Sequence, residues 1–214
     1  MTWKRKEKTW YRCGHVLSTF ISYLLYRPKI YGKNNIPKTG GVLIVPNHRA
    51  MLDIPILGCA TFRPLRFMAK IDLFKNRFVK WYFETNGSFS VDKESGDPKA
   101  IKKAVNVLKD GDALVIFPEG KRNRGESVGE LTPGVGFLAS KTNVPIIPVG
   151  IAGLDKAITY KFGFIPILTR GKVYIGDPID FYLDSDEKTS VVTKKIMDEL
   201  EKQLPVLFEK AKSL

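Results

Sequence analysis

Residues 41–53 read Gly-Val-Leu-Ile-Val-Pro-Asn-His-Arg-Ala-Met-Leu-Asp. The apolar run from Gly41 to Pro46 is short and follows another glycine, which is typical of a buried strand. A polar segment that contains His48 and Asp53 comes directly after this strand. In open α/β sheets, ligands bind beside the carboxyl ends of the strands. We therefore expect a functional group in this segment.

On both sides of this stretch the sequence alternates between strand and helix patterns. Further strands are predicted at 65–70, 87–91, 113–117 and 144–151, and helices at 76–85, 97–111, from 132 and from about 187. The pair Asp97-Pro98 indicates a helix start, with an N-cap aspartate and a first-turn proline. Such alternation predicts an α/β fold with a mostly parallel central sheet flanked by helices.

Two finer expectations concern the C-terminal third of the chain. Residues 173–175 are expected to add a strand at the edge of the sheet. The last helix is expected to bury one apolar face on the core, because its large apolar residues recur at helical spacing. That face consists of Val191, Met197, Leu200, Leu204 and Leu207.

The N-terminal segment, residues 1–28, is predicted to be an amphipathic helix, and residues 29–214 a single catalytic domain. The apolar block at 16–26 ends before Pro28 and is shorter than the ~20 residues that span a bilayer. Polar side chains fall on one helical face and large apolar ones on the other. Basic residues and Trp3, Trp10 and Tyr11 precede the block, which favours a helix lying in a membrane interface. The alternative is a helix whose apolar face packs on the protein's own core.

The charge of the chain is strongly positive. There are 35 Lys and Arg residues against 22 Asp and Glu residues, a net charge of +13. Such a surface attracts polyanions, among which nucleic acid, anionic lipid and acidic carrier proteins all qualify. The two cysteines, Cys13 and Cys59, form neither a Cys-x-x-Cys motif nor a Cys/His cluster, so zinc and redox motifs are absent from the sequence.

His48 and Asp53 are candidates for a paired acid and base. On one continuous helix their spacing would point the two side chains apart. They can meet if His48 lies in a turn and Asp53 in the first turn of the following helix. A carboxylate on one imidazole nitrogen fixes the tautomer and leaves the other nitrogen free to take a proton. Alternatively, Asp53 is an N-cap for the helix that begins near Ile54-Pro55.

A second polar segment, Phe117-Pro-Glu-Gly-Lys-Arg122, also follows an apolar strand. Its basic residues continue to Arg124 and are suited to hold a phosphate with side-chain forks and backbone N–H groups. A solvated basic loop is the alternative.

Taken together, the two segments closely resemble motifs of the glycerophospholipid acyltransferase family, and the 1-acylglycerol-3-phosphate acyltransferases in particular. These motifs are Pro-Asn-His-x-x-x-x-Asp at 46–53 and Phe-Pro-Glu-Gly-x-Arg at 117–122. Three further segments match in the same order: Ala69-Lys70 with Asp72-Leu73, Gly87–Lys93, and Val144–Val149. The resemblance spans roughly residues 29 to 180.

This resemblance implies a role for each matching residue. His48 is the general base that deprotonates the acceptor hydroxyl, and Asp53 orients it; the alkoxide attacks the thioester without an acyl-enzyme. The remaining site residues are expected to bind substrate: Glu119 and Gly120 the acceptor, Lys70, Lys93 and Arg122 its phosphate, with Arg49 as a further contact. No metal or redox cofactor is implied, and acyl-CoA or an acyl-acyl carrier protein is the co-substrate.

The sequence also departs from the family pattern at four positions. Lys93 replaces an arginine, which exchanges a planar fork for a point charge. The other departures are Ala50 for a frequent serine, Lys121 for a common threonine and Asn123 for a serine. These differences bear on the acceptor more than on the chemistry.

The expected reaction is acylation of lysophosphatidic acid to phosphatidic acid at the cytoplasmic face of a membrane. Glycerol 3-phosphate or another lysolipid is the alternative acceptor. A non-enzymatic binder of anionic lipid or nucleic acid is the alternative from another class, although no nucleic-acid-binding motif occurs and we expect no nucleic acid partner. A serine hydrolase is disfavoured because Gly125-Glu-Ser-Val-Gly129 follows a charged loop and both histidines precede it. The segment Tyr160–Arg170 is interpreted as a second membrane contact, part of an acyl-chain tunnel, or a buried strand with a turn.

Overall fold

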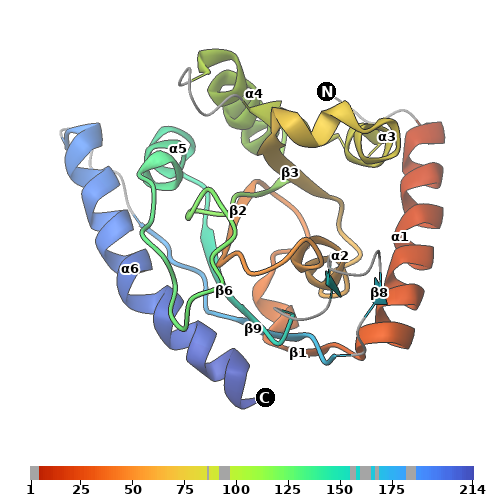
Figure 1. The fold of residues 1–214 in the computed structure, drawn as a ribbon. Coiled ribbons are helices and arrows are strands. Elements are labelled where there is room, and N and C mark those ends of the chain that lie inside the picture. The colour runs from red at the N-terminus through yellow and green to blue at the C-terminus, as the bar shows by residue number, and fades with distance from the viewer. Residues whose placement is uncertain are drawn as a thin grey trace.

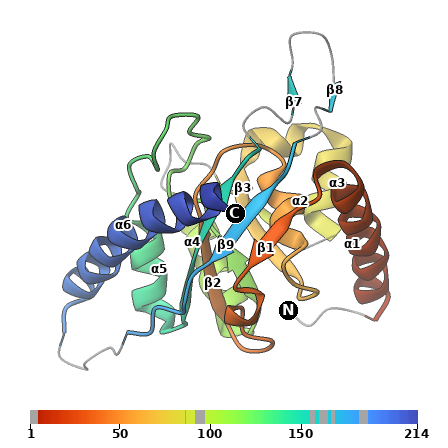
Figure 2. The same ribbon diagram turned by 90° about the horizontal axis from the view of Figure 1, so that it is seen from below.

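The computed structural model describes residues 5–85, 87–91, 97–154, 158–159, 165–166, 169–181 and 187–214. Seven strands form one sheet, and a two-stranded sheet pairs β7 (Ile158–Thr159) with β8 (Ile165–Pro166). In spatial order the large sheet consists of β1 (Lys29–Tyr31), β9 (Lys172–Ile175), β6 (Ile146–Ala152), β2 (Val42–Pro46), β5 (Ala113–Val115), β3 (Leu65–Lys70) and β4 (Phe89–Val91). Every neighbouring pair is parallel except β6 with β9. This confirms the predicted α/β fold with a mostly parallel sheet (Figures 1 and 2).

Helices cover both faces of the sheet, and the alternation of side chains in β2 explains why. Val42 and Ile44 point into one core, and Leu43 and Val45 into the other. The first core is covered by α1 (Arg5–Tyr26), α2 (Asp53–Gly58) and α3 (Arg77–Thr85). The second is covered by α4 (Pro98–Lys109), α5 (Gly134–Thr142) and α6 (Thr189–Ser213). A central strand buried on both sides therefore carries the loop with His48. Among the described residues there are also two short 3₁₀ helices, η1 (Lys33–Asn35) and η2 (Ile71–Lys75).

The predicted start of α4 is confirmed. The Asp97 carboxylate accepts hydrogen bonds from the backbone N–H groups of Lys99 and Ala100, at 3.0 and 3.2 Å, and Pro98 takes the first helical position. The α5 helix ends at Asn143, which adopts a left-handed conformation with φ of 50°. Local sequence signals thus set the helix ends on this face of the sheet.

The expected edge strand at 173–175 is wrong, and the expected buried face of α6 is confirmed except at Val191. Residues 172–175 form no edge strand: β9 lies between β6 and β1, and β1 takes the edge. The three residues of β1 follow Pro28 too closely for an apolar pattern to show in the sequence. Val191 is 43% exposed, and Val192 occupies the buried position instead. The buried stripe of α6 therefore begins one residue later than predicted.

The N-terminal helix packs the opposite way from an ordinary amphipathic helix. Its apolar residues Leu17, Phe20 and Leu24 are 60%, 65% and 62% exposed. Its polar face lies against α2, where Thr19 and Ser22 hydrogen-bond the buried Cys59 thiol. The alternative in which the apolar face packs on the protein's own core is therefore wrong. No described helix is long and apolar enough to cross a membrane.

Candidate active site

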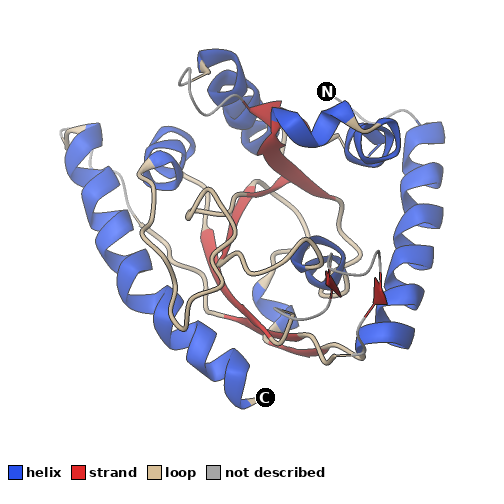
Figure 3. Cartoon of the chain, viewed as in Figure 1, coloured by secondary structure: helices blue, strands red, loops and turns tan. Residues whose placement is uncertain are grey.

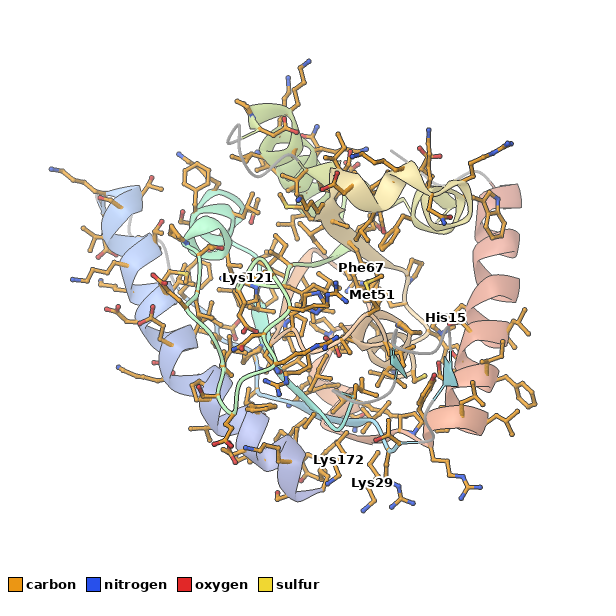
Figure 4. All side chains as sticks on the ribbon, viewed as in Figure 1. His15, Lys29, Met51, Phe67, Lys121 and Lys172 are labelled. Carbon is orange, nitrogen blue, oxygen red and sulfur yellow. The ribbon has the colours of Figure 1, made fainter. Side chains whose placement is uncertain are left out.

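The loops that follow β2 and β5 meet at the carboxyl ends of the central strands. They run through the middle of the molecule in the view down this edge of the sheet (Figure 3). Met51, from the first loop, and Lys121, from the second, both lie in the central part of this view, between the helices on the two sides (Figure 4). Parallel pairing of β2 with β5 brings the two loops to the same edge, as the sequence predicts.

Asn47 fixes the start of the first loop. Its side chain is fully buried and forms two hydrogen bonds with the backbone of Ile151 at the end of β6. The amide nitrogen donates to the Ile151 carbonyl at 3.0 Å, and the amide oxygen accepts from the Ile151 N–H at 2.6 Å. The residue before His48 is therefore tied to the neighbouring strand. Residue patterns alone assign Asn47 no role, although its position directly after the buried strand β2 is a signal for one.

His48 and Asp53 are in direct contact. Nδ1 of His48 lies 2.8 Å from Oδ2 of Asp53, because His48 is in the loop and Asp53 begins α2. The same oxygen accepts hydrogen bonds from the N–H groups of Arg49 and Ala50, at 2.6 and 2.9 Å. The N-cap of α2 is Leu52, and the Asp53 carboxylate turns back toward the loop. The N-cap alternative for Asp53 is therefore wrong.

Burial raises the pKa of Asp53, and its hydrogen bond and charge interaction with His48 oppose this rise. The carboxylate is fully buried, whereas the His48 side chain is 16% exposed. The imidazole stacks on the ring of Phe117, with the centroids 4.0 Å apart. Asp53 holds Nδ1, and none of the described residues holds Nε2 with a hydrogen bond. Nε2 is thus the nitrogen that can accept a proton from a substrate.

Glu119 joins the second loop to the first. Its Oε1 accepts a hydrogen bond from the backbone N–H of His48 at 2.7 Å, and its Oε2 accepts one from the N–H of Gly129 at 2.9 Å. The backbone N–H of Asn123 donates to the carbonyl of His48 at 2.8 Å. Gly120 adopts a positive φ of 66°, and its N–H donates to the Phe117 carbonyl in a tight turn. The two segments predicted to share a site are bonded to each other.

Arg49 is buried beside this contact. Its guanidinium donates to the carbonyl of Gly125 and lies 5.0 Å above the ring of Phe208 in α6. It therefore touches the second loop and the C-terminal helix at the same time. The buried Arg49 side chain therefore helps to hold the loop after β5 in position.

Two of the cationic residues predicted to bind the phosphate, Lys70 and Arg122, are exposed. Lys70 ends β3 and forms an ion pair of 2.7 Å with Asp72, which also pairs with Lys75 at 2.8 Å. These two lysines hold the pKa of Asp72 at about 2. Arg122 is exposed and immediately precedes Asn123. Lys93 lies outside the described residues, as does most of the segment Tyr160–Arg170. Within the described part of the chain, no three His, Cys, Asp or Glu residues group together as a metal site would require.

Comparison with known proteins agrees with this geometry. A family model described as Acyltransferase matches residues 27–152. The 1-acyl-sn-glycerol-3-phosphate acyltransferase of Bacillus subtilis is 30% identical over 204 residues, 91% of this chain and 98% of the relative. The enzyme of the same name from Streptococcus pneumoniae is 32% identical over 169 residues, 75% of this chain and 59% of the relative.

A solved structure shares the fold. The crystal structure of the 1-acyl-sn-glycerophosphate acyltransferase from Thermotoga maritima superimposes with a TM-score of 0.69 and is 23% identical, covering 95% of this chain and 84% of the other. At that identity the likeness concerns the fold alone. The family match covers more than half of the chain, and it includes both loops that meet at His48. The chain therefore belongs to the acyltransferase family and is an O-acyltransferase.

Proposed function

We propose that this enzyme transfers a fatty acyl group from a thioester to the free hydroxyl of lysophosphatidic acid, giving phosphatidic acid. The observation that carries the proposal is the pairing of His48 with the buried carboxylate of Asp53, with Nε2 left open at the carboxyl edge of the sheet. The names of the relatives from Bacillus subtilis and Streptococcus pneumoniae support lysophosphatidic acid as the acceptor.

In the proposed reaction His48 acts as general base and Asp53 orients it. Asp53 holds a proton on Nδ1, so Nε2 takes the proton of the acceptor hydroxyl as its oxygen attacks the thioester carbonyl. The new C–O bond forms, the C–S bond breaks, and the proton passes from the imidazolium to the leaving thiolate. The buried carboxylate stabilises the imidazolium in between. Since only a proton moves through the protein, no acyl-enzyme, metal or redox cofactor is required.

We assign the acceptor's phosphate to the cationic residues around this edge. Arg122 is the first candidate, because it is exposed and its neighbour Asn123 is bonded to the backbone of His48. Lys70 stands at the end of β3, where a phosphate would compete with Asp72. Lys93 carries over from the family resemblance as the third cation, and Gly120 as a contact to the acceptor.

The donor is either acyl-CoA or an acyl-acyl carrier protein. Both are anionic, so a chain of net charge +13 suits both. For the acyl chain we propose the cavity of about 440 Å³ between α1 and the sheet, which is within the usual size of a ligand pocket. It reaches Leu52 and Ile54, the residues on either side of Asp53, and Phe67 lines its wall (Figure 4).

We propose further that α1 binds a membrane surface with its exposed apolar face. Val16, Phe20 and Leu24 are largely exposed, and burial of such side chains in the bilayer interface is favourable. The basic residues that precede them in the sequence would lie at anionic headgroups. Placement at the cytoplasmic face follows from the family resemblance, and a buried free thiol at Cys59 suits a reducing compartment.

One experiment tests the reaction and the substrates together. Purified enzyme is offered each thioester with lysophosphatidic acid, glycerol 3-phosphate or another lysolipid, and the products are resolved by mass spectrometry. We expect phosphatidic acid as the main product, and loss of nearly all of it in His48→Ala with an unchanged circular dichroism spectrum. Product formed mainly from glycerol 3-phosphate or another lysolipid would replace the acceptor proposed here. Near-normal turnover by His48→Ala would remove His48 from the mechanism. Membership of the O-acyltransferase family already excludes the non-enzymatic alternative.

A further inference from the structure

Both carboxylate oxygens of Glu119 are already occupied by the protein backbone. Oε1 accepts from the N–H of His48 at 2.7 Å and Oε2 from the N–H of Gly129 at 2.9 Å. The residue is only 7% exposed. Each oxygen keeps a further lone pair, but the side chain is too buried to offer it readily to a substrate hydroxyl, and the two charge-assisted hydrogen bonds are stronger than neutral ones. The Glu119 carboxylate is therefore arranged to hold the backbone, and it is poorly exposed to a bound acceptor.

The peptide groups on both sides of His48 are held by the same loop. Glu119 holds the N–H of His48, and the backbone N–H of Asn123 holds its carbonyl at 2.8 Å. Asp53 and Phe117 fix the imidazole itself. The position of Nε2 thus depends on the segment 119–129 as well as on Asp53.

The segment 119–129 is shaped by Asn123. The amide oxygen of Asn123 accepts from the N–H of Gly125 at 2.8 Å, and its amide nitrogen donates to the carbonyl of Ser127 at 2.9 Å. Arg49 holds the far side of the loop through the carbonyl of Gly125. Asn123 stands where the family commonly has a serine, whose shorter side chain has one polar atom in place of two.

Gly129 is the second anchor of the Glu119 carboxylate. A Cβ atom at Gly129 would lie 2.7 Å from Oε2 of Glu119 and 3.0 Å from the side-chain nitrogen of Asn123. Any side chain at this position would therefore push the carboxylate out of place. The close approach at Gly129 is needed for the contact to form.

We propose that Glu119 is a positioning residue, which clamps the backbone of His48 to the segment 119–129 and so places Nε2 for proton transfer. This inference rests on the proposed function in so far as it assigns His48 the role of base. Arg122 and Gly120 remain with the acceptor, whereas Glu119 acts only through His48.

The test is Glu119→Gln, because the amide is isosteric and has one acceptor oxygen in place of two. At least one of the N–H groups of His48 and Gly129 then loses its acceptor. We expect amide hydrogen exchange at one or both of these residues, followed by NMR, to accelerate about tenfold or more. We also expect kcat to fall about 10²-fold, the loss typical of a displaced catalytic group, while KM for the acceptor changes less than about threefold.

Gly129→Ala tests the same contact without changing Glu119. It should accelerate exchange at His48 and lower kcat in the same direction. Gly134→Ala is the matched control, because a Cβ atom at Gly134 meets nothing within 4 Å. That variant should keep the wild-type exchange rates and the wild-type kcat.

The outcomes separate the clamp from the proposed function. A rise of tenfold or more in acceptor KM for Glu119→Gln, with unchanged kcat and unchanged exchange at His48 and Gly129, would show that Glu119 binds substrate and overturn the clamp. Unchanged exchange in both Glu119→Gln and Gly129→Ala would overturn it as well. If the wild-type enzyme transfers no acyl group to any acceptor, the proposed reaction fails, and the exchange rates still decide whether the clamp exists.

Discussion

Asp53 points one carboxylate oxygen at His48 and leaves the other without a hydrogen-bond partner. Oδ2 lies 2.8 Å from Nδ1 of His48 and also accepts two backbone N–H groups. Oδ1 of the same carboxylate is buried, and no described residue bonds to it. Buried polar atoms normally have a partner, and an unsatisfied one costs about 1–3 kcal/mol. The arrangement of Asp53 against His48 is therefore expected to reduce the stability of the fold.

Asp53→Asn separates the charge of this residue from its geometry. The amide oxygen of the variant can still accept from Nδ1 of His48 and from the two backbone N–H groups. The negative charge that stabilises the imidazolium is lost, so we expect kcat to fall on the order of 10²–10⁴-fold. Steady-state kinetics checks this, with circular dichroism to confirm the fold. A loss of less than threefold would mean that the charge of Asp53 does not assist the reaction.

The same variant is expected to change how stability depends on pH. Burial raises the pKa of Asp53 in the folded protein above the ordinary value, which is about 4 in the unfolded chain. Between these two values the folded state binds more protons than the unfolded state. The free energy of unfolding therefore falls as pH rises through this window. The Asp53→Asn variant has no carboxyl group at this position, so its free energy of unfolding does not fall for this reason.

Urea denaturation at a series of pH values from about 4 upward measures this effect. We expect the variant to become more stable relative to wild type as the pH increases, until the raised pKa is passed. If the difference in the free energy of unfolding between the variant and wild type stays constant over this pH range, the pKa of Asp53 is not raised in the folded protein.

Asn47→Ala should destabilise the edge of the sheet that carries the site. The substitution leaves the N–H and the carbonyl of Ile151 buried without their partner. Two unsatisfied backbone groups predict a loss of about 2 kcal/mol or more in the free energy of unfolding. Asn106→Ala, at an exposed position of α4, is the control and should change stability by less than about 0.5 kcal/mol. Equal effects of both variants would show that the contact to Ile151 contributes nothing.

The outward apolar face of α1 should decide membrane binding. Replacing Val16, Phe20 and Leu24 together by serine removes apolar surface that is already exposed to solvent and does not line the cavity behind α1. We expect the folded protein to remain stable and its affinity for anionic vesicles to fall at least about tenfold, because each large apolar side chain contributes on the order of 1 kcal/mol when buried. Vesicle sedimentation measures the change. Val206→Ser, at an exposed position of α6, is the control and should bind like wild type.

Several features of the fold follow from local patterns in the sequence. The apolar run at 41–46 and its counterpart at 113–117 predict buried strands, and parallel pairing then brings the loops after them to one edge. The contact of His48 with Asp53 is also predictable from the sequence, because the two residues are only five positions apart and a single turn can bring them together. The helix that begins after Asp97 is likewise set by its cap and proline.

Other features depend on partners far apart in the chain. β9 lies inside the sheet because β1, from the other end of the chain, pairs with it. The polar face of α1 lies inward, where Thr19 and Ser22 interact with the Cys59 thiol at the end of α2. Neither arrangement changes the local pattern of the segment concerned, so periodicity alone cannot reveal it.

The α/β alternation, the position of the two site loops and the contact of His48 with Asp53 can be predicted from residue type and spacing, because each depends on local patterns over a few turns of chain. The contacts of Glu119 and Arg49, by contrast, depend on how the chain folds in three dimensions. The partner of Glu119 is 71 residues away, and that of Arg49 is 76 residues away. A carboxylate or a guanidinium can bind any suitable group within reach, so the folded chain selects the partner.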